Sequence, residues 1–87
     1  MRVGDKDFPL VKIIWEDIIT DDNAWRTIDD ALDWADSESM LVHQVGYLLD
    51  EDENHYVLVG SIFADGSQVS IITKIPRGTV TKIEHLE

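Results

Sequence analysis

Residues 41–49, LVHQVGYLL, and residues 56–64, YVLVGSIFA, are two apolar runs separated by the polar segment DEDENH at residues 50–55. Both runs are rich in Val, Leu and aromatic residues, which favour strands, so the pattern predicts an antiparallel hairpin with a polar loop. The second run is apolar on both faces, which predicts a central strand covered on both sides. Gly46 in the first run indicates a close backbone approach or a bulge.

Further strands are predicted on both sides of this hairpin. Val11, Ile13 and Trp15 share one face of residues 10–19, which predicts the first strand. The other candidates are residues 68–75, after a tight-turn signal at Asp65–Gly66, and residues 80–86, after a break at residues 76–78. We expect residues 1–9 to be a loosely ordered lead-in. Strands in consecutive order predict a curled, five-stranded antiparallel sheet that closes as a small barrel.

One helix is predicted between the first strand and the hairpin. Thr27 is a suitable N-cap, and Asp30 three residues later can complete a capping box. The helix carries an apolar stripe, made of Ile28, Ala31, Leu32 and Ala35, and three aspartates off that stripe, Asp29, Asp33 and Asp36. A helix this short gains little stability alone, so we expect it to dock on the sheet, with Trp25 packed on the stripe. Residues 20–26 have the composition of a turn.

The size and composition of the chain predict one small domain, residues 1–87. Its core is small, so we expect a homo-oligomer that shares apolar surface. Cysteine is absent, which excludes disulfides and thiolate chemistry and fits a cytoplasmic protein, in the host cytoplasm if the chain is viral. No signal-peptide pattern and no apolar run of the ~20 residues that span a bilayer are present, so we expect no membrane partner.

The net charge of −11 is unevenly distributed. Residues 1–55 hold 15 acidic and 4 basic residues, a sum of −11, whereas residues 56–87 hold 3 of each and sum to zero. A field of this sign repels nucleic acids and anionic membranes. The acidic part therefore indicates either a surface that maintains solubility or one that faces a basic partner.

A basic island in the neutral part suggests an anion site. Lys74, Arg77 and Lys82 surround a break at Pro76 and Gly78. The Arg77 guanidinium offers a fork of donors for phosphate or carboxylate, and Gly78 permits a close backbone approach. The alternative is that these bases pair with the acids of the helix. Trp15 or Tyr47 could stack on a ligand held by Arg77, Lys74 and Gly78.

Signals for catalysis and for a metal or cofactor are weak. The loop at residues 50–55 lacks the Gly and Glu that a calcium loop requires, because His55 and Ser61 stand at those positions. The three histidines lie in three different elements and lack zinc-motif spacing. Asp29, Asp33 and Asp36 would stay ionised on an exposed helix face, where they suit a partner surface better than acid–base catalysis. We therefore predict a protein that is not an enzyme, with no metal and no cofactor.

Residues 74–83, KIPRGTVTKI, resemble the second signature of Sm-like proteins, a hydrophobic residue followed by Arg-Gly, two variable residues and a β-branched residue. Gly60, Ile62 and Asp65 are similar to the first signature. The resemblance implies a strongly bent five-stranded barrel of the Sm-like or SH3-like kind that forms rings through its exposed edges. It also implies that Arg77 and Gly78 lie near the inner rim and that RNA binds there.

The layout of the chain is also similar to that of small proteins of tailed phages. The similar positions are Trp15–Asp17 early, Val45–Tyr47 in the middle and Ile75–Gly78 late. This second resemblance implies that the protein is encoded by a phage.

These observations give one leading hypothesis and two alternatives. We expect a non-enzymatic, homo-oligomeric binding module, phage-encoded if the second resemblance holds, that captures a small anionic ligand such as a nucleotide at a subunit interface. The first alternative is an acidic nucleic-acid mimic that inhibits a basic host protein through Asp29, Asp33 and Asp36. The second is Sm-like RNA binding, against which the net charge of −11 argues.

Overall fold

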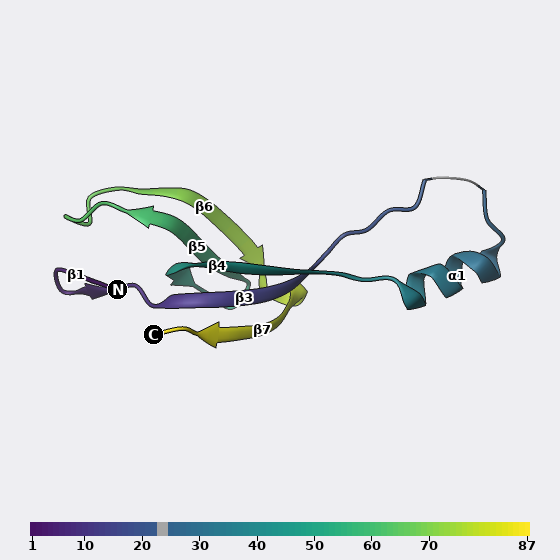
Figure 1. Ribbon diagram of the computed structural model, residues 1–87, viewed down its shortest axis with the longest axis horizontal. Coiled ribbons are helices and arrows are strands. Elements are labelled where there is room, and N and C mark those ends of the chain that lie inside the picture. The colour runs from purple at the N-terminus through teal and green to yellow at the C-terminus, as the bar shows by residue number, and fades with distance from the viewer. Residues whose placement is uncertain (23–24) are drawn as a thin grey trace.

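The computed structural model describes residues 1–22 and 25–87, which form seven β-strands, one α-helix and a single 3₁₀ turn (Figure 1). In chain order the elements are β1 (Arg2–Val3), β2 (Lys6–Asp7), β3 (Leu10–Asp17), α1 (Ile28–Ser37), β4 (Met40–Glu51), β5 (His55–Ile62), β6 (Val69–Pro76), η1 (Arg77–Thr79) and β7 (Val80–His85). The protein is therefore mainly β with one short helix after the first long strand, as the sequence predicts. Residues 23 and 24 of the predicted turn lie outside the described part.

The long strands form one antiparallel sheet in the order β6-β5-β4-β3-β7. The predicted hairpin is confirmed as β4 and β5, and β5 is flanked by a strand on each side. The expectation of consecutive order is wrong for the last strand, because β7 pairs with β3 and not with β6. The reason is η1, where the Val80 N–H donates to the Arg77 carbonyl and turns the chain toward the other edge. The two edge strands are not paired with each other, so the sheet is not closed.

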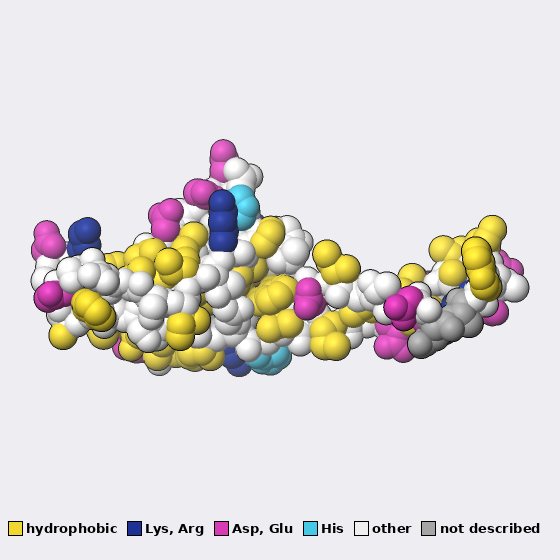
Figure 2. All heavy atoms as spheres, turned by 90° about the horizontal axis from the view of Figure 1, so that it is seen from above, with side chains coloured by type: hydrophobic (Ala, Val, Ile, Leu, Met, Phe, Trp, Pro, Cys, Tyr) yellow, Lys and Arg dark blue, Asp and Glu magenta, His cyan; other side chains and the backbone are white. Residues whose placement is uncertain are grey.

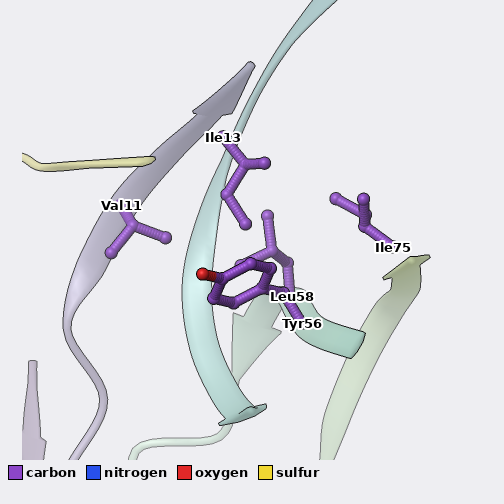
Figure 3. Close-up of a cluster of buried hydrophobic side chains, with 5 residues drawn as sticks. All are labelled: Val11, Ile13, Tyr56, Leu58 and Ile75. Carbon is purple, nitrogen blue, oxygen red and sulfur yellow. The ribbon is translucent and has the colours of Figure 1, made fainter. Parts of the chain in front are cut away.

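A single apolar core lies inside the curl of this sheet (Figure 3). Val11 and Ile13 of β3 are completely buried, as their shared face predicts, and they meet Tyr56 and Leu58 of β5 and Ile75 of β6. Since β3 and β6 are not neighbours in the sheet, the sheet must curl to bring them onto one core. Four half-buried side chains complete the cluster: Trp15, Leu48, Val80 and Ile83.

Two glycines stand at positions where a side chain would clash or where the backbone would be strained. A Cβ atom at Gly46 would lie 3.0 Å from the Val59 carbonyl oxygen, so the close approach predicted there is confirmed. Gly66 has a φ of 76° in the turn before β6, which is the left-handed region that glycine tolerates. Asp65 supports the same turn by accepting a hydrogen bond from the Ser67 N–H at 2.9 Å.

The first nine residues form more structure than a loose lead-in. β1 and β2 pair as a small hairpin, with Arg2 opposite Asp7 and Val3 opposite Lys6. Gly4 between them has a φ of 62°.

The helix does not dock on the sheet of its own chain, which contradicts the expectation from its apolar stripe. Residues 18–22 and 25–39, which we call the arm, project from the ends of β3 and β4 (Figure 1), and the molecule measures 58 × 21 × 20 Å. No residue of α1 is buried, and Trp25 is fully exposed instead of packed on the stripe. β3 and β4 pair as far as Asp17 and Met40, so the arm starts at the end of this ladder and leads α1 away from the sheet.

Replacing Ile13 by Ala should lower the free energy of unfolding by about 2–5 kcal/mol, because it leaves a cavity in a fully buried site. The matched control is Ile72→Ala on the edge strand β6, where the side chain is 62% exposed and the loss should stay below about 1 kcal/mol. Urea unfolding of both variants measures this. Equal losses would contradict the core described above.

Candidate functional site

A groove opens where the end of β3 faces the end of β6. Its volume is about 230 Å³, and apolar side chains of both strands line most of it. The lining residues are Trp15, Glu16, Asp17, Ile18, Thr73, Lys74, Ile75, Pro76 and Thr79. The arm begins at the rim of this groove, because Ile18 belongs both to the lining and to the arm. A groove of this size admits one or two apolar side chains of a larger binding partner.

A relay of two hydrogen bonds holds Trp15 in place at this groove. The Trp15 indole Nε1 donates to Gln44 Oε1 at 3.2 Å, and Gln44 Nε2 donates to Thr73 Oγ1 at 2.9 Å. The relay therefore crosses from β3 through β4 to β6. It satisfies the polar edge of the indole and leaves the rest of the ring available as an apolar wall. Gln44 and Thr73 were not identified from the sequence, although an amide inside the apolar run 41–49 is a usable signal.

The two walls of the groove carry opposite charge. Glu16 and Asp17 at the end of β3 are exposed carboxylates, and Lys74 on β6 is an exposed ammonium group. Lys74 forms no ion pair within residues 1–22 and 25–87, whereas Lys12 and Lys82 both pair with Glu84, at 3.2 and 2.8 Å. Lys74 is therefore the base of the predicted island that remains available for a partner.

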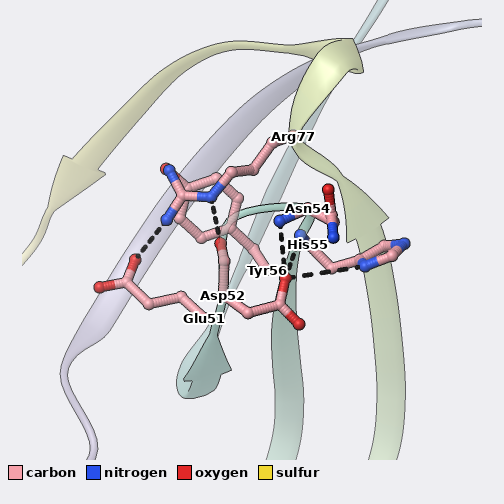
Figure 4. Close-up of polar contacts among 6 residues, drawn as sticks. All are labelled: Glu51, Asp52, Asn54, His55, Tyr56 and Arg77. Carbon is pink, nitrogen blue, oxygen red and sulfur yellow. Dashed lines mark hydrogen bonds and ion pairs between the residues drawn. The ribbon is translucent and has the colours of Figure 1, made fainter.

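Arg77, in contrast, is engaged by its own chain (Figure 4). Its guanidinium lies 4.3 Å from the centre of the Tyr56 ring, and Nη1 donates to the Tyr56 hydroxyl at 2.9 Å. Nε donates to the Asp52 carbonyl oxygen, and Nη2 lies 3.4 Å from Glu51 Oε2. The Arg77 side chain thus ties η1 to the loop between β4 and β5. The alternative reading of the sequence pairs these bases with acids of the helix, but Arg77 pairs with Glu51 at the end of β4, and Lys82 with Glu84.

The same loop has an internal hydrogen-bond network. The backbone N–H groups of Asn54 and His55 both donate to Asp52 Oδ1 at 2.7 Å. These two bonds, in that order of importance, lower the pKa of the Asp52 carboxyl, and electrostatic interactions with His55 and Lys74 lower it further. The segment at residues 50–55 begins like a calcium loop, but here the Asp52 carboxylate holds a turn together by binding backbone N–H groups.

The other predicted ligand residues lie in different surroundings. Tyr47 on β4 pairs with Leu10 and Val59, so it lies at the opposite end of β3 from Trp15 and does not line the groove. Gly78 in η1 is exposed, and a Cβ atom there would meet nothing within 4 Å, so no close approach requires a glycine. Of the five predicted ligand residues, the structure brings only Trp15 and Lys74 together in the groove.

The arm is the second feature of the surface. Thr27 is the N-cap of α1, as predicted, since its hydroxyl accepts from the Asp30 N–H at 3.1 Å. Ile28 is 81% and Leu32 60% exposed, so the apolar stripe is open to solvent. Figure 2 shows hydrophobic side chains gathered at the far end of the arm beside acidic ones.

The predicted partner residues Asp29, Asp33 and Asp36 lie along this helix. All three are exposed, and none takes part in an ion pair within the described part of the chain. At 3.6 residues per turn they lie on the Leu32 side of the stripe, whereas Trp34 lies on the other side. The helix therefore presents an apolar face with three of its four aspartates along one flank.

Within the described residues no group of three or more His, Cys, Asp or Glu side chains could hold a metal ion. The same part of the chain contains no helix with the length and hydropathy needed to cross a membrane. Comparisons with protein-family models, with curated proteins and with solved structures give no match.

Replacing Arg77 by Ala should lower the free energy of unfolding by about 1–2 kcal/mol, since it removes a stacked cation and charge-assisted hydrogen bonds at a partly exposed site. Arg77→Lys should recover little, because an ammonium group cannot both stack on Tyr56 and bridge the loop. Lys82→Ala, which breaks an exposed ion pair on β7, is the control and should leave stability nearly unchanged. Thermal unfolding compares the three, and an Arg77→Ala protein as stable as the control would contradict the clamp.

Proposed function

We propose that the protein is a non-enzymatic binding module in which a folded body presents a protein-binding arm. The body, in this proposal, is the small, strongly bent barrel that the Sm-like and SH3-like resemblance implies. Three features support that assignment: the strand order β6-β5-β4-β3-β7, the curl over one core, and the η1 turn at Arg77–Gly78 between the edge strands.

The observation that carries the proposal is the exposure of the whole apolar face of α1. Trp25, Ile28 and Leu32 are large apolar side chains that remain mostly exposed in the described part of the chain. Burying one such side chain completely contributes roughly 1.5–3 kcal/mol. A ten-residue helix is marginal alone in water, so α1 gains its stability from the surface that covers it. Trp is moreover enriched at the energetic centres of interfaces.

The charges of the arm define the chemistry of its partner. Asp29, Asp33 and Asp36 lie along one flank of the apolar face and have no basic partner among the described residues. The complementary surface is an apolar groove with positive charge along one side. A basic protein surface that otherwise receives nucleic acid has this chemistry, which is the sense in which the arm can act as a nucleic-acid mimic.

Replacing Leu32 by Asp, or Asp29, Asp33 and Asp36 together by Lys, should abolish the recovery of bound protein in affinity capture from host extract. The first change places a charge in the apolar contact, and the second reverses the complementary charge. Phe63→Asp, at an exposed apolar position on the body, is the matched control and should bind like the unmodified chain. Recovery that none of the arm variants changes would reject the proposal.

A second function, capture of a small anionic ligand such as a nucleotide, is favoured by one observation. Trp15 and Lys74 line the same groove, so a ring could stack while a phosphate meets the ammonium group. Arg77 contributes little to this site, because its donors already serve Tyr56, Glu51 and Asp52. The carboxylates of Glu16 and Asp17 at the same groove disfavour a polyanion, so Sm-like RNA binding is the weaker proposal.

Nucleotides should raise the melting temperature of the protein if this second function is correct, because a ligand that binds the folded state stabilises it. Lys74→Ala should remove the rise and Lys82→Ala should retain it. A thermal-shift panel of nucleoside mono- and diphosphates measures the effect. The absence of a shift with every nucleotide would exclude the ligand site and leave the arm proposal unaffected.

A further inference from the structure

We propose that the partner of the arm is a second copy of this chain, whose groove between β3 and β6 receives the apolar face of α1. This inference rests on the proposed function, since it identifies what the arm binds. The groove and the apolar face of α1 are two surface features of the described chain that have no complementary partner within it. The structure thus presents an apolar helix face and an apolar groove on the same molecule.

The arm cannot reach the groove of its own chain in the structure. The groove lies at the base of the arm, with Ile18 in its lining, whereas α1 lies at the far end of a molecule 58 Å long. In the structure the arm continues from the ends of β3 and β4 and holds α1 away from this groove (Figure 1). The apolar stripe of α1 is suited to docking on a sheet. In this proposal it docks on the sheet of another copy.

The charges of the two surfaces match in only one orientation. The groove is acidic on its β3 wall, at Glu16 and Asp17, and basic on its β6 wall, at Lys74. The helix has Asp29, Asp33 and Asp36 along one flank and Trp34 along the other, and its fourth aspartate, Asp30, lies nearly opposite the apolar stripe. With Leu32 in the groove, the aspartate flank must lie toward Lys74, because the opposite orientation places carboxylates against carboxylates. The indole N–H of Trp34 then faces the acidic wall, where donors are favoured.

The net charge of −11 does not prevent this contact, because the charge is concentrated in one part of the chain. The arm belongs to residues 1–55, which carry the entire −11, and the β6 wall belongs to residues 56–87, whose charges sum to zero. Docking places the flank of Asp29, Asp33 and Asp36 beside β6, which belongs to the neutral segment of the other copy. Repulsion between the remaining acidic surfaces acts over longer distances, and physiological salt screens it beyond about 8 Å.

Reciprocal exchange of arms would double the buried apolar surface. If each copy donates α1 and receives the α1 of its partner, a closed dimer forms with two equivalent contacts. This arrangement exchanges a helix and leaves the edges of β6 and β7 unused, so it differs from ring formation through strand edges.

The test is a complementation experiment that reads molecular mass by light scattering after size-exclusion chromatography. The unmodified chain should have at least twice the single-chain mass of 9.9 kDa. Leu32→Asp, which damages the arm, and Lys74→Glu, which damages the groove, should each have the single-chain mass. An equimolar mixture should regain the higher mass, because the intact arm of the Lys74→Glu chain fits the intact groove of the Leu32→Asp chain.

The controls separate this contact from unfolding and from other interfaces. Lys82→Glu reverses an exposed base outside the groove and should retain the higher mass. Circular dichroism checks that each variant keeps the sheet. An unmodified chain with the single-chain mass, or an oligomer that neither Leu32→Asp nor Lys74→Glu dissociates, would overturn the inference.

Failure of this inference differs from failure of the proposed function. A monomer whose affinity capture still depends on Leu32 would retain the arm as a binding element for another protein and reject only the second copy. A mixture that stays at the single-chain mass, although the unmodified chain is an oligomer, would also reject exchange between arm and groove.

Discussion

Backbone hydrogen bonds hold β3 against β4 in an antiparallel register of eight residue pairs, from Leu10–Tyr47 to Asp17–Met40. At one end of this ladder β3 contributes Val11 and Ile13 to the core, and at the other end the two strands lead into the arm. The same register places Trp15 beside the β4 segment that carries Gln44, through which Trp15 reaches Thr73 on β6. The core, the groove and the direction of the arm all depend on this pairing.

The curl of the sheet brings the chain break at Pro76 and η1 into contact with β5 and the loop before it. Pro76 cannot donate to the ladder, and η1 follows it, so the chain leaves β6 and crosses to β3. This crossing places Arg77 over Tyr56 and the loop at residues 51–55. One base of the basic island is therefore used to hold the fold together, while Lys74, three residues earlier on the groove wall, remains available.

The arm shows a conflict between local and global preference. Its helix has a correct N-cap and an apolar stripe, which are features of a helix that packs on a sheet, yet no residue of α1 is buried. Natural proteins keep such conflicts mainly where function requires them. Three unpaired aspartates along the stripe would keep the helix soluble. Solubility does not explain why the large apolar side chains of Trp25, Ile28 and Leu32 are exposed beside them. A surface that becomes buried on association explains both the apolar and the acidic residues.

The long strands and the helix could be predicted from the sequence, because they depend on short-range information, whereas the small hairpin of β1 and β2 could not. Alternating and continuous apolar runs predicted β3 to β7, Asp65–Gly66 predicted a turn, and Thr27 predicted the start of α1. Other features could be seen only in the folded protein. β7 pairs with β3, and Arg77 binds Tyr56. Trp15 and Lys74 share a groove, whereas Tyr47 and Gly78 lie apart from it. These contacts join residues far apart in the chain, and the curl of the sheet and the direction in which β3 and β4 leave it bring them together. Periodicity and turn composition carry no information about that direction, so the exposed position of α1 could not be predicted from its stripe.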